Sequence, residues 1–308
     1  MKRGLSLAGV FLLAALSSAS FELVLGIDET NMQIDRFDGV TGAYLGSFAK
    51  GVTGGGGALA IDQSKGLCYN NNFLNRTIQV WNYNTGEFVN EYATTNTLRG
   101  LAINNAGELL LGTTNGIQRV NPSTGAVIAT YFGSVSFSGV EQAPDGSYVA
   151  VNISNNTLVK YDSNFVQTGG APFGMGTASA IQWQIAFAGT QGYATNNDAV
   201  VQFSVSGSAP DLGTSYNPAS IERVLGVGVG HASRRYAAGR TPSTNLPAIH
   251  AFSDVGGGGY VSHITFSRPG AATGYYDSIA VVVAPEPSTI MGFAVGLALL
   301  ARRRRARG

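Results

Sequence analysis

One glutamate stands where a carboxylate could do chemistry. Glu141 interrupts an apolar segment at residues 139–143, and two earlier copies of that segment carry Ala60 and Ala102 at the same place. A carboxylate in such a segment needs a partner or a metal ion, and carboxylate and amide oxygens are the ligands that Ca²⁺ takes. Three asparagines could supply amide oxygens beside it: Asn104, Asn152 and Asn196. Glu141 is therefore a candidate ligand for a divalent cation, although placement in loops or at strand edges also explains the asparagines.

The chain has only three histidines, His231, His250 and His263. No two of them have the spacing of a metal-binding pair on one element. We therefore expect each to be an exposed or hydrogen-bonded structural residue. The single cysteine, Cys68, excludes an intramolecular disulfide and lies in an alternating apolar segment, which predicts a buried and unreactive thiol.

The C-terminal stretch combines three features in a fixed order. Pro285 and Pro287 flank Glu286 and interrupt regular structure, because each proline fixes φ and removes a backbone donor. An apolar run follows at residues 290–301. Four arginines come next and favour the cytoplasmic side of a membrane: Arg302, Arg303, Arg304 and Arg305. This order predicts an exported body, a motif at 285–287, a transmembrane segment at 288–301 and a retaining basic tail at 302–308.

This stretch resembles the PEP-CTERM sorting segment of bacteria, through Pro285-Glu286-Pro287, Ser288-Thr289, the apolar run and the arginines. The resemblance implies recognition by an exosortase, a membrane enzyme that cleaves near the motif and releases or transfers the body. It also implies a Gram-negative bacterium that makes extracellular polysaccharide. The alternative is a plain membrane anchor. The apolar run would be roughly 18 Å long as a helix, whereas a span normally needs about 20 residues, so a transient intermediate fits it better.

The N-terminus carries a second export signal. Lys2 and Arg3 form a positive region, residues 5–16 are apolar, and residues 17–19 are small, as at a cleavage site. These features predict a signal peptide at 1–19, with an N-terminal anchor helix as the alternative. The expected body, residues 20–284, has 12 Lys+Arg and 17 Asp+Glu, which gives a net charge of −5. A body of this charge argues against a nucleic-acid partner, which needs a basic face.

The body consists of a repeat of about 40 residues with short strands and no long helical periodicity. The apolar start at residues 58–62 recurs at 100–104 and 139–143. A second segment, which ends in Thr-Gly, recurs as well: residues 80–86 compare with residues 119–125 and with an earlier copy at 34–42. Four short strands in each unit of this length are typical of a β-propeller blade. In the clearest unit we expect strands at 58–62, 66–70, 77–83 and 87–92.

The number of units predicts an all-β propeller with six blades. Full units are expected to begin near Ala58, Gly100, Gly139, Ser179 and Ile221, and three strands precede the first of them. The apolar segment 276–283 is expected to close the ring as the inner strand of the first blade. Seven blades are the main alternative, because residues 234–275 are irregular. A two-sheet sandwich is a weaker alternative, since it does not explain the period.

The units resemble the broad group of six- and seven-bladed propellers that contains NHL-type and YVTN-type repeats, streptogramin-lyase-like proteins and gluconolactonases. The resemblance rests on the strand pattern and the Asn/Asp-x-Thr-Gly turns over most of the body. It implies two possible activities. Gluconolactonase-like sites hold one cation with Glu, Asn and Asp, and streptogramin-lyase-like sites use histidines at the channel mouth. The residues around His231 and His263 match no such motif.

Two hypotheses about function follow. The first is a non-enzymatic propeller that is sorted to the cell surface, the outer membrane or the extracellular matrix through an inner-membrane-anchored intermediate. There it would bind polysaccharide or a surface protein. The second is a hydrolase or lyase that uses a divalent cation at Glu141. Aromatic residues in the strands are expected to pack between blades, with a carbohydrate-stacking surface as the alternative: Trp81, Tyr83, Tyr92, Tyr131, Tyr148, Tyr161, Trp183 and Tyr193.

Overall fold

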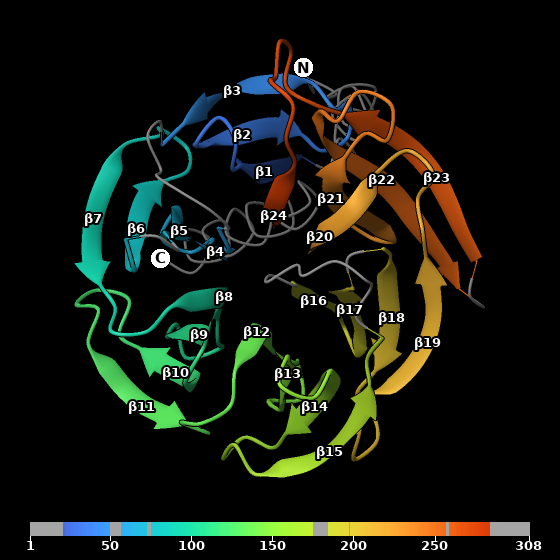
Figure 1. The fold of residues 1–308 in the computed structure, drawn as a ribbon. Helices are drawn as coiled ribbons and strands as arrows, with labels where there is room; N and C mark the ends of the chain where they lie inside the picture. Colours follow the sequence, from blue (N-terminus) through green and yellow to red (C-terminus); the bar gives the residue numbers. More distant parts are fainter. Residues whose placement is uncertain are drawn as a thin grey trace, which may run out of the picture.

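The computed structural model describes residues 21–49, 57–72, 75–174, 184–196, 198–256 and 259–283, and the regular structure in these ranges is β-strand. The strands form six four-stranded antiparallel sheets, which stand as blades around a central axis (Figure 1). The six-bladed propeller is thereby confirmed. The seven-bladed alternative is wrong, because the irregular residues 234–275 supply the three outer strands of the sixth blade.

Each blade runs from an inner strand at the axis to an outer strand at the rim. Blade 1 consists of β24 (Tyr276–Val283), β1 (Glu22–Asp28), β2 (Gln33–Asp38) and β3 (Tyr44–Phe48). Blade 2 consists of β4 (Leu59–Asp62), β5 (Leu67–Asn72), β6 (Thr77–Asn82) and β7 (Phe88–Ala93). Blade 3 consists of β8 (Leu98–Ile103), β9 (Leu109–Thr113), β10 (Gly116–Val120) and β11 (Val127–Tyr131).

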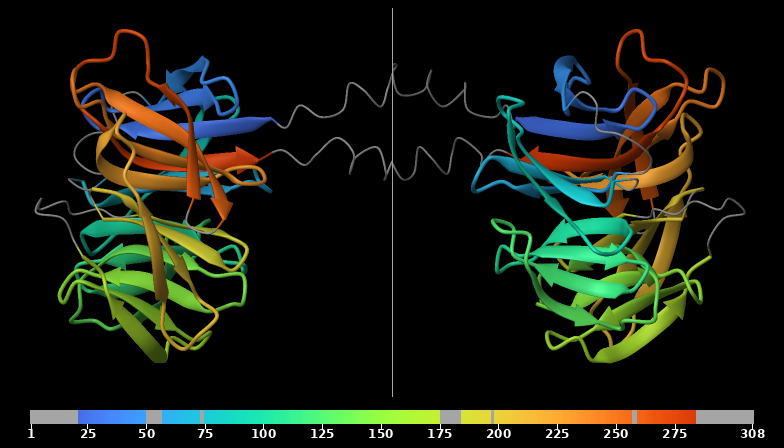
Figure 2. Two further views of the ribbon diagram at one scale, coloured as in Figure 1. Left: turned by 90° about the vertical axis from the view of Figure 1, so that its right-hand side faces the viewer. Right: turned by 60° about the vertical axis from the view of Figure 1, so that its left-hand side comes forward.

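The second half of the ring repeats this order. Blade 4 consists of β12 (Phe137–Gln142), β13 (Tyr148–Asn152), β14 (Thr157–Tyr161) and β15 (Gln167–Pro172). Blade 5 consists of β16 (Ile185–Ala188), β17 (Gln191–Thr195), β18 (Val200–Ser204) and β19 (Asp211–Tyr216). Blade 6 consists of β20 (Glu222–Val229), β21 (Arg234–Arg240), β22 (Pro247–Gly256) and β23 (Gly259–Phe266). Side views show these strands stacked next to one another within each blade (Figure 2).

The ring is closed by β24, as the sequence predicts. This strand pairs antiparallel with β1 along its length, from Glu22 opposite Val283 to Asp28 opposite Tyr276. The first and last strands of the body thus share one blade. Tyr276 and Ile279 are fully buried against Val24 and Phe37 of blade 1 and Ile249 of blade 6. Closure therefore joins the chain ends and also completes a hydrophobic core between two blades.

The recurring turn before the outer strands of blades 1, 2 and 3 has a local chemical cause. The Oδ1 atom of Asn82 accepts the N–H groups of Asn84 and Thr85, and that of Asp38 accepts the N–H groups of Val40 and Thr41 in the same way. The chain then needs a left-handed residue, and Gly86 supplies it with φ of 80°. Glycine adopts this conformation at little steric cost. The repeat in the sequence is thus a repeat of turn geometry.

The aromatic side chains pack mainly between blades, which agrees with the structural interpretation of their recurrence. Phe165 lies between Tyr131 of blade 3 and Tyr148 of blade 4, with ring centroids 3.9 and 4.1 Å away. Such pairs add about 0.5–1.5 kcal/mol each beyond the area that they bury. Trp183 lies outside the described residues. Cys68 is fully buried, and burial raises the pKa of its thiol, which agrees with an unreactive cysteine.

Several of the predicted elements lie outside the described residues: the signal peptide at 1–19, the motif at 285–287, the transmembrane segment at 288–301 and the arginines at 302–305. In the part of the chain that the structure describes, no helix has the length and hydropathy needed to cross a membrane.

Candidate functional site: the central channel

The six inner strands surround a channel with two different ends. Residues near the starts of the inner strands and the loops before them line one cavity, and residues further along the same strands line another. The six inner strands therefore run in the same direction along the axis. We call the end where they start the upper end and the opposite end the lower end.

Gln184 crosses the channel immediately before β16. Its Nε2 donates to the carbonyl oxygen of Ile279 at 2.5 Å, and its Oε1 accepts the N–H groups of Ile279 and Val227, each at 3.1 Å. One side chain thus links the inner strands of blades 1 and 6 to the start of blade 5. Gln184 lines both cavities, as Leu101 and Ile185 do, so it lies at the boundary between the upper cavity and the lower one.

We expect Gln184→Met to destabilise the ring by roughly 3 kcal/mol, because a buried backbone group that loses its partner costs about 1–3 kcal/mol. Urea unfolding of residues 20–284 measures the change. The matched control is Gln191→Met, since Gln191 donates one hydrogen bond within its own blade, to Phe203 O at 2.5 Å. Equal losses of stability in the two variants would contradict the bridging role of Gln184.

The lower cavity has a volume of about 320 Å³, and its wall exposes both polar and apolar surface, although most of the lining side chains are apolar. Each of the six inner strands contributes to the wall, and four alanines keep it wide: Ala60, Ala102, Ala186 and Ala280. Glu141 of β12 is the one carboxylate among the described lining residues, and it stands where blades 2 and 3 have alanine. The predicted equivalence of these three positions is therefore reflected in the structure.

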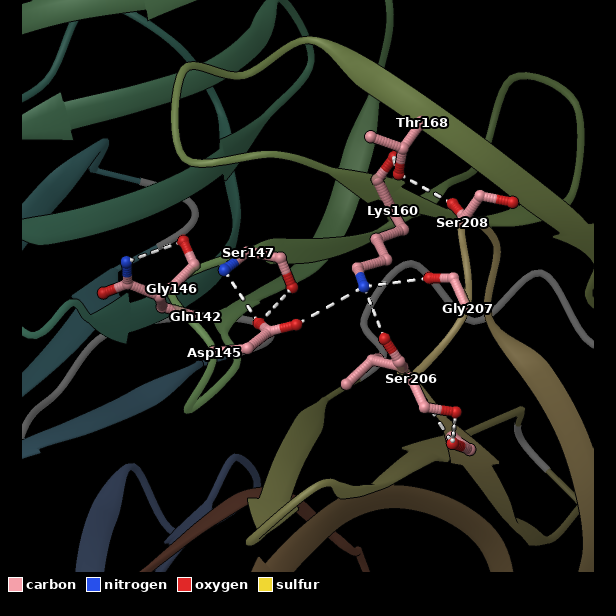
Figure 3. Close-up of polar contacts among 11 residues, drawn as sticks. Gln142, Asp145, Gly146, Ser147, Lys160, Thr168, Ser206, Gly207 and Ser208 are labelled. Atoms are coloured by element: carbon pink, nitrogen blue, oxygen red, sulfur yellow. Dashed lines mark hydrogen bonds and ion pairs between the residues drawn. The ribbon is translucent and has the colours of Figure 1, made fainter.

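The Glu141 carboxyl has little hydrogen bonding to stabilise its charge. Its Oε1 accepts the N–H of Gln142 at 3.2 Å. Burial raises the pKa of Glu141 to about 8, so the carboxyl is mostly protonated at neutral pH. The neighbouring Gln142 side chain is occupied by the turns around it. It donates to Gly146 O at 3.1 Å (Figure 3). It also accepts from Asn105 N at 2.7 Å.

Blade 4 is held at this end by a second group of polar contacts. Lys160 is largely buried and reaches blade 5, where it donates to Gly207 O at 3.0 Å and to Val205 O (Figure 3). Its ammonium also lies 3.4 Å from the Asp145 carboxylate in the turn after β12. These contacts join β14 and the turn after β12 to the turn between β18 and β19 of blade 5.

The residues around Glu141 do not fit a divalent cation. The three candidate asparagines form turns of their own: Asn104 accepts from Ala106 and Glu108, Asn152 accepts from Ser154, and Asn196 accepts from Asp198 and Ala199. Asn152 and Asn196 also follow strands that end at the upper end, away from Glu141. Ca²⁺ takes six to eight oxygen ligands. Within the described residues, no three acidic, histidine or cysteine side chains gather as a metal site.

The upper end of the channel is polar and differs from the lower end. Its cavity is only about 10 Å³, just large enough for one water molecule, and Arg99, Gln184 and Asp277 are among its lining residues. Five buried polar atoms near this end have no hydrogen-bond partner among the described residues: Asn71 Nδ2, Arg99 Nε, Ser138 Oγ, Arg223 Nε and Asp277 Oδ2. Because buried polar groups in native proteins are nearly always paired, this cluster points to contacts with water or a ligand.

Charge is also concentrated at the upper end. Burial first, and repulsion by the neighbouring Glu29 second, raise the pKa of Asp277 well above its ordinary value. The N–H of Gly57 and the guanidinium of Arg223 act in the opposite direction. Arg223 lies over the ring of Tyr275, 4.4 Å from its centroid, and has φ of 50° at an irregular point of β20. This mouth therefore combines two arginines, two acids and an aromatic ring.

The histidines lie in blade 6, away from both cavities. His250 is buried and hydrogen-bonded to Ser220, Thr265, Tyr216 and Ser262. Burial lowers its pKa to about 4, so the imidazole is neutral. His263 contacts Ser253 at 2.5 Å on the exposed face of β23. These contacts agree with the predicted structural role.

Sequence reasoning missed the upper mouth. Arg99 and Asp277 each follow the first residue of an inner strand, which is a signal of the same kind as Glu141 in β12. A systematic comparison of the inner strands would have found both. No local pattern marks Gln184, because its role depends on partners in β20 and β24 that only the closed ring brings near.

The fold and the channel define the class of this protein as a six-bladed β-propeller. A comparison with protein families adds a second feature: residues 283–305 match the PEP-CTERM protein-sorting motif. The predicted sorting segment is confirmed by this match, which contains Pro285, Glu286 and Pro287. The chain thus carries a signal that implies export and processing by an exosortase at the membrane. No match was found among the curated proteins.

Solved structures are similar to this chain in fold. A Bacteroides caccae protein of unknown function is 11% identical over 85% of this chain and 99% of its own, with a TM-score of 0.63. A chain of the nidogen/laminin complex is 11% identical over 84% and 98%, with a TM-score of 0.65. The periplasmic gluconolactonase of Pseudomonas aeruginosa is 14% identical over 82% and 85%, with a TM-score of 0.54. At these identities the similarity establishes the propeller fold alone.

Proposed function

We propose that this protein is a non-catalytic binding module that is exported, sorted through its C-terminal motif and delivered to the cell surface or extracellular matrix to bind polysaccharide. In this proposal the signal peptide at 1–19 directs export. The segment 288–301 with Arg302, Arg303, Arg304 and Arg305 holds a transient intermediate in the inner membrane, and the exosortase is the processing partner. The body, residues 20–284, is the module that reaches the destination.

The observation that carries the binding role is the group of half-buried side chains at the upper mouth, Arg99, Arg223 and Tyr275, beside buried polar atoms that have no partner among the described residues. A polysaccharide presents hydroxyl groups that donate and accept hydrogen bonds. The guanidinium groups of Arg99 and Arg223 offer fixed donors, and the Asp277 carboxyl offers an acceptor or, when protonated, a donor. The half-buried ring of Tyr275 adds an aromatic surface at the same place. Together these groups suit a hydroxyl-rich polymer better than an apolar ligand.

The test is binding of the extracellular polysaccharide of the producing bacterium to immobilised residues 20–284, which contain all 24 strands of the closed ring. We expect Arg99→Gln with Arg223→Gln to weaken binding by about tenfold or more, because a lost hydrogen bond to a charged group costs about 1.5–3 kcal/mol. Lys65→Gln, in a turn at the lower end, is the matched control and should bind as the parent does. Unchanged binding by the double variant, or none by the parent, would refute this role.

The alternative function, a divalent-metal-dependent hydrolase or lyase, depends on Glu141. The feature in its favour is a carboxyl of raised pKa in a cavity of suitable size. The small number of oxygens near this carboxyl weighs against it.

A further inference from the structure

We propose that the lower cavity is a binding site for a small aliphatic amine in its ammonium form. The alkyl chain would lie against the apolar wall, and the ammonium group would pair with the carboxylate of Glu141. This site is distinct from the polysaccharide site, because no charged residue lines both cavities.

The size and wall of the cavity support a small ligand with an apolar part. Its volume of about 320 Å³ lies at the lower end of the range for small-molecule sites, about 300–1,000 Å³. Such sites are mostly apolar, with a few polar groups that orient the ligand. The wall holds the alanines of four inner strands together with Ile103, Phe187 and Val229. An alkyl chain gains free energy against these apolar side chains.

The polar groups of the cavity determine the charge of the ligand. The side-chain amides of Gln142 and Gln184 are already committed to backbone groups. Glu141 is the remaining polar side chain among the described lining residues, and its Oε1 accepts one N–H, from the next residue. A carboxylate repels anions and gains most from a cation that brings its own N–H donors. An ammonium ion has both the charge and the donors.

The surrounding elements bring no second charge to Glu141. The described lining residues of β4, β8, β16, β20 and β24 contain no titratable side chain. Charged groups at this end pair with one another: Asp62 with Lys65 at 2.7 Å, Glu108 with Arg119 at 2.7 Å, Asp145 with Lys160 at 3.4 Å, and Glu22 with Arg234 at 3.9 Å. The ligand would therefore be the counter-ion that the carboxylate of Glu141 otherwise lacks.

Binding must then be linked to a proton. In the free protein the pKa of Glu141 is about 8, so at pH 6 the carboxyl is protonated and must lose its proton to the buffer before it pairs with the ammonium ion. We expect the affinity to rise about tenfold per pH unit up to about pH 8. Above that it should stay constant until the amine itself loses its proton, near pH 10. At pH 7 about one proton should be released for each ligand bound.

Isothermal titration calorimetry of residues 20–284 tests the proposal, with hexylammonium, 1-hexanol and hexanoate as probes of equal chain length. We expect hexylammonium to bind best and hexanoate least. Glu141→Gln should weaken hexylammonium binding by about tenfold or more and remove its pH dependence, while leaving 1-hexanol binding unchanged. Glu87→Gln, an exposed glutamate on the rim, should behave as the parent does. The melting temperature of each variant checks that it is folded.

Three results would overturn the proposal. One is the absence of hexylammonium binding by the parent protein, and another is equal binding by folded Glu141→Gln. The third comes from a titration with Ca²⁺ in the same calorimeter: stoichiometric binding that Glu141→Gln abolishes would assign Glu141 to a metal instead.

Discussion

Replacing Pro285 and Glu286 by alanine is expected to leave the exported chain uncleaved and retained in the membrane. The matched motif begins at Val283, the last residue of the closing strand. Proline cannot donate a ladder hydrogen bond, so Pro285 and Pro287 keep the following segment from extending β24. From the two prolines we expect the motif to be an extended linker that a processing enzyme can reach. Alanine at position 285 restores the donor, and alanine at 286 removes the one carboxylate of the motif.

The measurement is immunoblotting of membrane and released fractions from the native host, with an antibody against the propeller. The variant should run as a single larger species in the membrane fraction, and the parent as a shorter species. A double substitution on the exposed rim of blade 4, Asn164→Ala with Gln167→Ala, controls for general effects on export. Normal processing of the motif variant would show that these two residues are not what the enzyme recognises.

Ending the chain before β24 is expected to abolish cooperative folding. A chain of residues 20–274 loses Tyr276 and Ile279, which are fully buried, and Val282, which is 7% exposed. Each such side chain contributes about 1.5–3 kcal/mol by burial, so together they approach the 5–15 kcal/mol of a typical domain. The truncation also removes the Tyr276 hydroxyl, which donates to buried Asp35 at 2.7 Å, and the backbone partner of Gln184.

Circular dichroism and thermal melting of the two truncated chains give the result. Residues 20–284 should melt in one sharp transition, whereas residues 20–274 should lack near-ultraviolet signal and aggregate on heating. A sharp transition in the shorter chain within a few degrees of the longer one would mean that blade 1 is stable as a three-stranded sheet.

The sequence predicts those parts of this fold that depend on local chemistry. The turn residues and short apolar runs place the four strands of blade 2 within two residues of their observed bounds, because Asx turns and left-handed glycines act over a few residues. Closure of the ring by residues 276–283 could be predicted as well. This apolar segment belongs to none of the five full units, and the first blade lacks an inner strand. The sequence predicts that blade 5 starts near Ser179, but its inner strand β16 begins at Ile185.

The channel could be predicted only in part. Glu141 could be predicted as a candidate site residue, because two other copies of the repeat have alanine at its position. The upper mouth joins Arg99 of β8 to Asp277 of β24 and Arg223 of β20, residues that are far apart in the sequence and have no shared pattern. Their proximity is a property of the ring. The same holds for Gln184. Its three hydrogen bonds all go to backbone groups, which every residue has, so the residue types of its partners do not predict the contacts.

The first strand of the propeller begins where its last strand ends, and this position determines how a tethered chain is oriented. Glu22 at the start of β1 is paired with Val283 at the end of β24, at the lower end of blade 1 (Figure 2). A chain held in the bilayer through the residues after Val283 would therefore stand with its lower end toward the lipid and its upper mouth outward. The mouth would be open to polymer while the chain is still tethered. Cleavage would then release propellers that already have polysaccharide bound.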